Sequence, residues 1–174
     1  NRTVELEGEA YFEVEKSVHP FFVKTESGKI EVLGTEFNIK CYSDEAALVT
    51  TLVNGKVKFD NGMNPSVILK PEEQLIFEKE NCQSIVRKIN VNHYIGWKDN
   101  RLSFQGERLD MIMKTLSRWY NVEVVFEDST LKALEFSGNL DKFTDIQEFL
   151  SLFELGVNVK FEIKDRTVYI RKGN

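Results

Sequence analysis

Residues 47–60 read ALVTTLVNGKVKFD, and this stretch decides the fold class of the first half of the chain. Apolar and polar side chains alternate on both sides of Asn54 and Gly55, the residue pair most typical of a tight two-residue β-turn. The pattern predicts a β-hairpin centred on this pair. Short alternating runs continue in both directions, and the stretch from Asn1 to Ile89 shows no long helical pattern.

Two further segments support a β domain. Residues 4–15 (VELEGEAYFEVE) alternate almost throughout and predict one strand, and residues 21–32 predict a hairpin whose turn, 26–29, contains Gly28. A loose echo of Leu, Gly and Phe recurs in residues 6–12, 33–37 and 52–59, a pattern that stacked β-units or edge-to-edge hairpins of any β domain would produce. We therefore expect a mainly β N-terminal domain that is either β-solenoid-like or a rolled sandwich.

The second half of the chain mixes helices with strands. One helix is predicted by apolar residues at helical spacing, with Asn121 as a left-handed cap: Leu109, Ile112, Met113, Leu116 and Tyr120. A second helix should begin at Thr144, in a capping box with Gln147, and end at Gly156. The order β-α-β-β-α-β with one added strand predicts a small α+β domain of split βαβ type, with both helices on one face of a sheet.

Residues 90–100 (NVNHYIGWKDN) resemble a connector between these two parts. Trp97 is expected to anchor the connector against one of the neighbouring cores. We therefore predict two domains, residues 1–92 and 93–174.

Composition limits the classes of function. The chain has 174 residues, 41% of them hydrophobic, which is enough for a substantial core without a metal or disulfide. There are 23 Lys and Arg against 28 Asp and Glu, interspersed without a basic cluster, so we expect no nucleic-acid partner. No stretch approaches the roughly 20 apolar residues of a membrane span, so we expect no membrane contact by this chain. Because the sequence does not begin with Met, we interpret it as a fragment, with any targeting or membrane segment upstream.

The chain shows no arrangement of residues typical of catalysis. His19 and His93 have no neighbouring ligand or dyad partner, and Cys41 and Cys82 lack metal-type spacing and are expected to be free thiols. The alternating glutamates of residues 5–15 are interpreted as a solvated strand face rather than a cation site. We therefore predict no catalytic, cofactor-binding or metal-binding residues, and a function in binding rather than as an enzyme.

Four motifs in the first half resemble the FecR family signature. They are GEAYFEV at residues 8–14, PFFV at 20–23, VLGTEFN at 32–38 and LVNGKV at 52–57. The remainder, from Trp97 to Ile170, is similar to the C-terminal domain of many FecR-like anti-sigma factors, which is related to the short N-terminal fold of secretins and TonB-dependent receptors. Family members usually have strands before the residue-4 strand, so the first sheet is expected to lack its first strands.

The resemblance implies a protein that carries a signal across the bacterial envelope to regulate transcription. In this interpretation the chain is the periplasmic portion of a single-pass inner-membrane protein. Its partners would be the N-terminal signalling domain of an outer-membrane TonB-dependent receptor and, through an upstream cytoplasmic segment, an extracytoplasmic-function (ECF) sigma factor. The family offers no catalytic residues or cofactors.

The small α+β domain offers edge strands to which a partner could add by backbone pairing. Two segments are candidates for this edge, residues 134–140 (LEFSGNL) with Leu134, Phe136 and Gly138, and residues 166–170 (RTVYI) with Thr167 and Tyr169. Contact through the β domain, or through a groove between the domains, is an alternative. A carbohydrate-binding β-module of a nutrient-uptake system would instead show exposed coplanar aromatic residues, and a weak secreted hydrolase would show a cleft with a perturbed acid.

Overall fold

The computed structural model of the chain describes residues 2–141 and 145–173. Its contacts divide the chain into two units, residues 1–98 and 99–174, whereas the sequence pattern placed the division between 92 and 93. Each unit has a hydrophobic core of its own. The two units are therefore described separately.

The first unit consists of two five-stranded sheets. Sheet A contains, in spatial order, β1 (Arg2–Glu5), β3 (Phe21–Thr25), β4 (Gly28–Val32), β7 (Val57–Asp60) and β8 (Val67–Leu69). Sheet B contains β10 (Gln83–Lys88), β9 (Glu73–Glu78), β6 (Ala47–Asn54), β5 (Thr35–Cys41) and β2 (Gly8–Val14).

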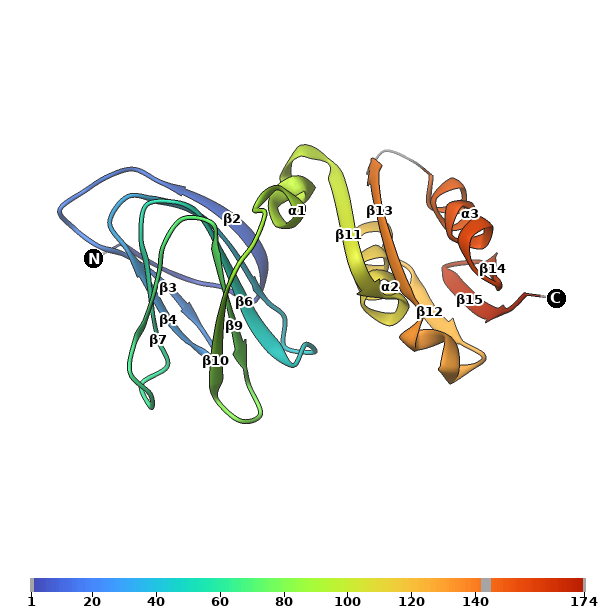
Figure 1. Cartoon of the computed structure of the whole chain (residues 1–174), viewed down its shortest axis with the longest axis horizontal. Coiled ribbons are helices and arrows are strands. Elements are labelled where there is room, and N and C mark those ends of the chain that lie inside the picture. Colours follow the sequence, from blue (N-terminus) through green and yellow to red (C-terminus); the bar gives the residue numbers. More distant parts are fainter. Residues whose placement is uncertain (1, 142–144, 174) are drawn as a thin grey trace. The chain divides into compact units, whose positions relative to one another are not determined.

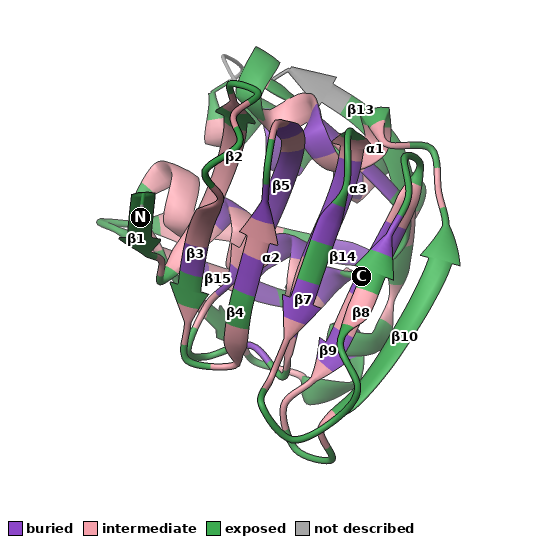
Figure 2. Cartoon of the chain, turned by 90° about the vertical axis from the view of Figure 1, so that its left-hand side faces the viewer, coloured by how far each residue is buried: buried purple, intermediate pink, exposed green. Residues whose placement is uncertain are grey.

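The two sheets pack face to face, because alternate residues of each strand are apolar and point to a shared core. Figure 2 shows this alternation of buried and exposed residues along β4 and β7. Aromatic rings meet across the core. The ring centres of Phe59 in sheet A and Phe77 in sheet B are 5.1 Å apart, and those of Phe21 and Phe12 are 5.9 Å apart. This is the rolled-sandwich alternative of the sequence prediction.

The predicted hairpin at Asn54 and Gly55 is wrong. The strands on its two sides, β6 and β7, belong to different sheets, so the turn is a corner that carries the chain across the sandwich. Gly55 has φ +94°, and a Cβ there would lie 2.6 Å from the carbonyl oxygen of Gly34, in the corresponding corner between β4 and β5. Thr35 Oγ1 donates to the Lys56 carbonyl (3.0 Å), which ties the two corners together. The change of chain direction at this point was therefore predicted correctly, but the two-residue turn and the strand pairing were not.

The predicted single strand over residues 4–15 is also interrupted. Its first part is β1, in sheet A, and its second part is β2, in sheet B. The chain turns between them at Leu6, whose N–H donates to Lys24 (2.9 Å), and Gly8 follows with φ +114°. By contrast, the hairpin over residues 21–32 is confirmed, because β3 and β4 pair with Thr25 opposite Gly28.

In its described residues, the second unit contains two smaller sheets, two helices and one 3₁₀ turn. Sheet C consists of β11 (Arg101–Arg108) and β13 (Glu135–Asp141), and sheet D of β12 (Glu123–Phe126), β15 (Thr167–Lys172) and β14 (Val159–Lys164). The helices are α2 (Leu109–Tyr120) and α3 (Ile146–Gly156), and the 3₁₀ turn is η2 (Ser129–Ala133).

Each helix of this unit contacts both sheets. Helix α2 packs on β11 and β12, and Phe153 of α3 contacts Phe136 of β13 (4.7 Å between ring centres) and Phe161 of β14 (6.3 Å). The helices therefore form a layer between sheets C and D. The prediction of one small sheet with both helices on one face is wrong, because the strands form two sheets and the helices contact both.

The ends of both helices follow from local sequence. Asn121 ends α2 in the left-handed conformation (φ 54°, ψ 51°), and its N–H donates to the Ser117 carbonyl, as predicted. Helix α3 ends at Gly156, also as predicted. Its N-cap is Asp145, whose carboxylate accepts the Gln147 N–H (2.9 Å), whereas the predicted cap, Thr144, lies outside the described residues.

Candidate functional site at the edge of sheet C

Strand β13 provides the candidate site. Within the described residues it pairs on one side only, with β11, in a two-stranded antiparallel sheet (Figure 1). The Leu134 carbonyl accepts the Leu109 N–H (2.7 Å), so the backbone groups of Leu134 face the β11 side. Because these groups alternate along a strand, those of Glu135, Ser137 and Asn139 face the opposite side. Their N–H and C=O groups form the candidate edge.

Three of the five predicted site residues lie on this strand or directly before it. Leu134 and Phe136 are half-buried and pack on the domain core, where Phe136 meets Phe153 edge to face at an interplanar angle of 78°. Gly138 is exposed, and a Cβ added to it would have no atom of the described structure within 4 Å. The two phenylalanines hold the strand against the helix layer, and Gly138 leaves open space beside it.

The other two predicted residues do not lie on an open edge. Thr167 and Tyr169 belong to β15, which is the central strand of sheet D. It pairs antiparallel with β14 on one side and parallel with β12 on the other. Both rows of its backbone groups are therefore used within the sheet. The prediction of an edge at these residues is wrong, and the structure places the two predicted segments in different sheets.

Strand β14 is an edge strand of sheet D, but part of its edge is occupied. The Glu154 carboxylate of α3 accepts the backbone N–H of Phe161 (2.8 Å) and the ammonium of Lys160 (2.6 Å). The Lys160 bond, followed by the Phe161 bond, lowers the pKa of Glu154 and keeps it ionised. An incoming strand would have to displace this carboxylate, so β14 is a poorer site for strand addition than β13.

The other strand of sheet C, β11, has a bulge opposite the middle of β13. The register shifts between Phe104 and Glu107, and Gly106, with φ +62°, donates its N–H to Ser137 Oγ (2.8 Å). At the end of β11, Arg108 forms an ion pair with Asp110 (2.8 Å), which lowers the pKa of that carboxyl. A bulge and a charge pair make β11 less suitable than β13 for pairing with another strand.

Sequence reasoning missed a row of polar residues that crosses the outer face of sheet B. Five residues lie opposite one another on successive strands: Tyr11, Asn38, Thr51, Gln74 and Arg87. We call these the polar row. Gln74, which is fully buried, donates to Thr51 Oγ1 (2.8 Å) and accepts from Arg87 Nε (3.0 Å) and Nη2 (2.7 Å). The available signal was the amide of Gln74 directly before the apolar run of residues 75–77 in β9.

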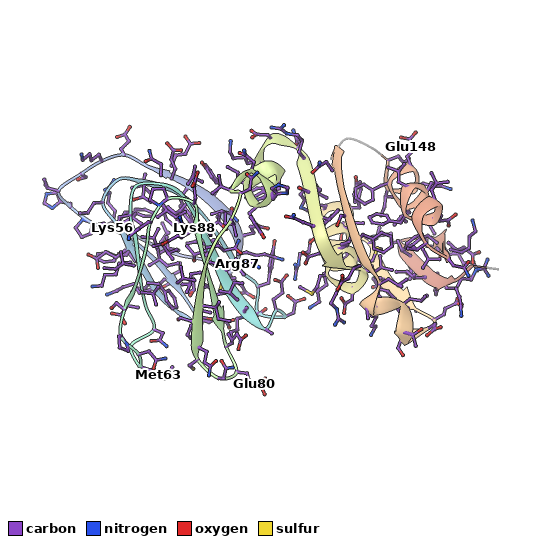
Figure 3. The ribbon with its side chains drawn as sticks, in the orientation of Figure 1. Lys56, Met63, Glu80, Arg87, Lys88 and Glu148 are labelled. Carbon is purple, nitrogen blue, oxygen red and sulfur yellow. The ribbon has the colours of Figure 1, made fainter. Side chains whose placement is uncertain are left out.

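The polar row holds the connector, which forms α1 (Asn92–Ile95) and η1 (Gly96–Asp99). Figure 3 labels Arg87, which lies on β10 and begins this set of contacts. Three pairs join the connector to the row: Arg87 Nη2 donates to Tyr94 Oη (3.1 Å), Trp97 Nε1 donates to Asn38 Oδ1 (3.2 Å), and Lys98 Nζ lies 5.2 Å from the ring centre of Tyr11. Trp97 therefore anchors the connector on the first unit through a polar contact.

The described residues offer little for catalysis or metal binding. Among them, no group of three or more His, Cys, Asp or Glu side chains is placed to hold a metal. A polar depression of about 370 Å³ lies beside the end of α3, but its carboxylate, Glu154, is already bound to Lys160 and Phe161. Both cysteines are free thiols, and burial is the main cause that raises the pKa of Cys41.

The exposed apolar residues do not resemble a sugar-binding platform. In the described part of the chain, the large apolar side chains with substantial exposure are Val, Leu, Ile and Met. A glycan surface would use aromatic rings. In that same part, no helix has the length and apolar character needed to cross a membrane.

Comparison with known proteins follows the same division of the chain. Residues 1–58 match the family model described as FecR protein, and residues 101–170 match the model described as FecR, C-terminal. Two crystal structures of a proposed anti-sigma factor from Parabacteroides distasonis ATCC 8503, at 1.65 and 2.50 Å resolution, are similar to this chain. Both have a TM-score of 0.89, with 24% and 25% sequence identity, and the match covers 99% of this chain and 81% of that protein. The comparison with curated proteins gives no match.

Proposed function

Because this chain belongs to the FecR family of anti-sigma factors, we propose that it is the signal-receiving region of a transmembrane sigma-factor regulator. In this proposal the chain lies in the periplasm. The regulator crosses the inner membrane once, upstream of this sequence, and its cytoplasmic segment contacts an ECF sigma factor. The chain itself acts by binding and carries out no reaction.

The proposed partner is the N-terminal signalling domain of a TonB-dependent outer-membrane receptor. The observation that supports this partner best is the edge of β13, which is unpaired within the described residues and backed by a packed helix layer. A domain with exposed strands of its own could extend sheet C by main-chain hydrogen bonds. Leu134 and Phe136 would keep β13 in place, and Gly138 would allow close approach of the partner backbone.

Calorimetric titration with the isolated signalling domain of the receptor encoded beside this protein tests the proposal. The decisive variant is Asn139→Pro, because proline removes an N–H that faces away from β11 and leaves the pairing within sheet C intact. Asn139→Ala is the matched control, since it removes the same side chain and keeps the N–H. Thermal unfolding of both variants checks that the domain folds.

We expect saturable binding by the wild-type chain and by Asn139→Ala. Asn139→Pro should weaken binding by about tenfold or more, because it removes one hydrogen bond and obstructs the added strand. Absence of saturable heat with the wild-type chain at high concentration would refute the proposed partner. Equal affinity of the alanine and proline variants would refute the edge of β13 as the site.

A further inference from the structure

Helix α3 has an exposed apolar stripe that its own domain does not cover. Leu152 and Leu155 are 50% and 85% exposed, whereas Phe149, Leu150 and Phe153 of the same helix are buried. In a short helix of a monomeric domain, such exposed positions are normally occupied by polar residues. The stripe is therefore either covered by a partner protein or lowers the solubility of the domain.

The direction of this stripe follows from the contacts of the helix. Glu154 reaches β14, where it binds Phe161 and Lys160. Leu152 precedes Glu154 by two residues, which is a rotation of about 200° around the helix axis. The two side chains therefore point to nearly opposite sides of the helix. Phe153, between them, contacts both Phe136 of β13 and Phe161 of β14. Leu152 therefore lies on the side of α3 away from β14, next to the edge of β13.

The charges beside the stripe are acidic. Glu148 is one turn before Leu152 on the same helix face, and Figure 3 shows it pointing outward at the start of α3. Asp145, the N-cap, is exposed at the same end, whereas Glu135, at the start of β13, lies opposite Arg108 of β11. A segment lying along this surface would meet uncompensated negative charge at the end near the start of α3.

We infer that the edge of β13 and the α3 stripe form one binding surface for an extended, amphipathic segment of the partner protein. An added strand would lie about 4.8 Å from β13, so its inward side chains would continue the layer in which Phe136 packs on α3. Apolar residues at alternate positions of the segment cover Leu152 and Leu155. A Lys or Arg at its end pairs with Glu148. This inference rests on the proposed function and defines the chemistry of the partner strand.

The occupied edge of β14 determines on which side of α3 the segment can bind. Because Glu154 already binds the N–H of Phe161, a strand that approaches α3 from the β14 side finds a charged carboxylate rather than a free donor. The same helix thus closes one edge with Glu154 and supports the other with Leu152. The segment therefore adds to the β13 edge of sheet C and not to the β14 edge of sheet D.

The test uses the same signalling domain as probe, with the variants Leu152→Ser, Leu155→Ser and Glu148→Lys. Ile85→Ser is the matched control, because Ile85 is an exposed aliphatic residue (47%) on β10, in the other unit. Each leucine variant should weaken binding about tenfold, since it removes apolar contact area from the interface and leaves the domain core unchanged. Glu148→Lys should weaken binding and reduce its dependence on salt concentration. Ile85→Ser should bind as the wild type does.

The outcomes separate this inference from the proposed function. If the wild-type chain gives no saturable heat, the proposed partner is wrong. If it binds and Asn139→Pro abolishes binding while Leu152→Ser and Leu155→Ser retain full affinity, the edge is correct and the α3 stripe is not part of the surface. Analytical sedimentation of the free chain measures its oligomeric state as a further test. A dimer that dissociates in Leu155→Ser would show that a second copy covers the stripe and would overturn the inference.

Discussion

Replacement of Gln74 by alanine should destabilise the first unit strongly. Its side chain is fully buried and binds both Thr51 and the guanidinium of Arg87. Loss of the amide leaves the Thr51 hydroxyl, which is 1% exposed, without this partner, at a cost of about 1–2 kcal/mol. The two bonds to Arg87 add about 1–2 kcal/mol, discounted because Arg87 is exposed and can turn to water. We expect a total loss of about 2–4 kcal/mol.

Urea unfolding measures this loss. Trp97 reports on the first unit, because its indole donates to Asn38, and a Trp119→Phe background removes the signal of the other tryptophan. Gln83→Ala, an exposed glutamine on β10, is the control and should change the unfolding free energy by less than about 0.5 kcal/mol. Amide exchange in the connector should also become faster, since Arg87 holds Tyr94. A loss below about 1 kcal/mol would refute the reasoning that the polar row is a principal support of this sheet.

Three further predictions concern single residues. Thr50→Val should raise the unfolding free energy in urea by about 1 kcal/mol, because the buried Thr50 hydroxyl has no hydrogen-bond partner among the described atoms; destabilisation would refute this. Asn121→Ala should lower the melting temperature, which corresponds to a loss of about 1 kcal/mol of stability, because alanine tolerates a positive φ poorly. Asn121→Gly should not lower it, and equal melting temperatures of the two variants would contradict the left-handed cap. Glu154 has a pKa below its ordinary value of 4.5, so its stabilisation is complete above that value and lost as the pH falls through its lower folded pKa. Glu154→Gln should flatten acid unfolding in this range, and an unchanged acid limb would contradict it.

The corner at Gly55 shows how far sequence could determine this fold. The Asn54-Gly55 pair correctly indicated a change of chain direction, which Gly55 makes at a φ of +94°, because that is a property of the local backbone. Whether the next strand folds back in the same sheet or crosses to the other depends on contacts with Gly34 and Thr35, about 20 residues away. Alternation of apolar residues is the same in both cases, because both strands face one core. Non-local packing therefore decided what the local pattern could not.

The candidate site divides in the same way. Phe136 and Gly138 were predicted to lie on an edge strand, and β13 is one because its sheet has two strands in the described residues. Tyr169 was not predicted correctly, because the parallel pairing between β12 and β15 joins segments that are distant in sequence. The residues of a strand do not by themselves indicate which strands pair with it. The stripe at Leu152 was visible as an excess of apolar residues in α3. Its exposure, however, required knowledge of which helix face the two sheets cover.

Four of the eight edge strands in the described part of the chain carry a feature that discourages pairing with another chain. Strand β8 has three residues, β10 ends in Arg87 and Lys88, β11 has a bulge, and the edge of β14 is occupied by Glu154. The middle of β13, residues 137–139, consists of Ser, Gly and Asn, without a charge. An open edge without a charge costs the protein protection against aggregation, so its retention is best explained by use. The exposed leucines of α3 beside the same strand strengthen this argument, because two independent liabilities meet at one surface.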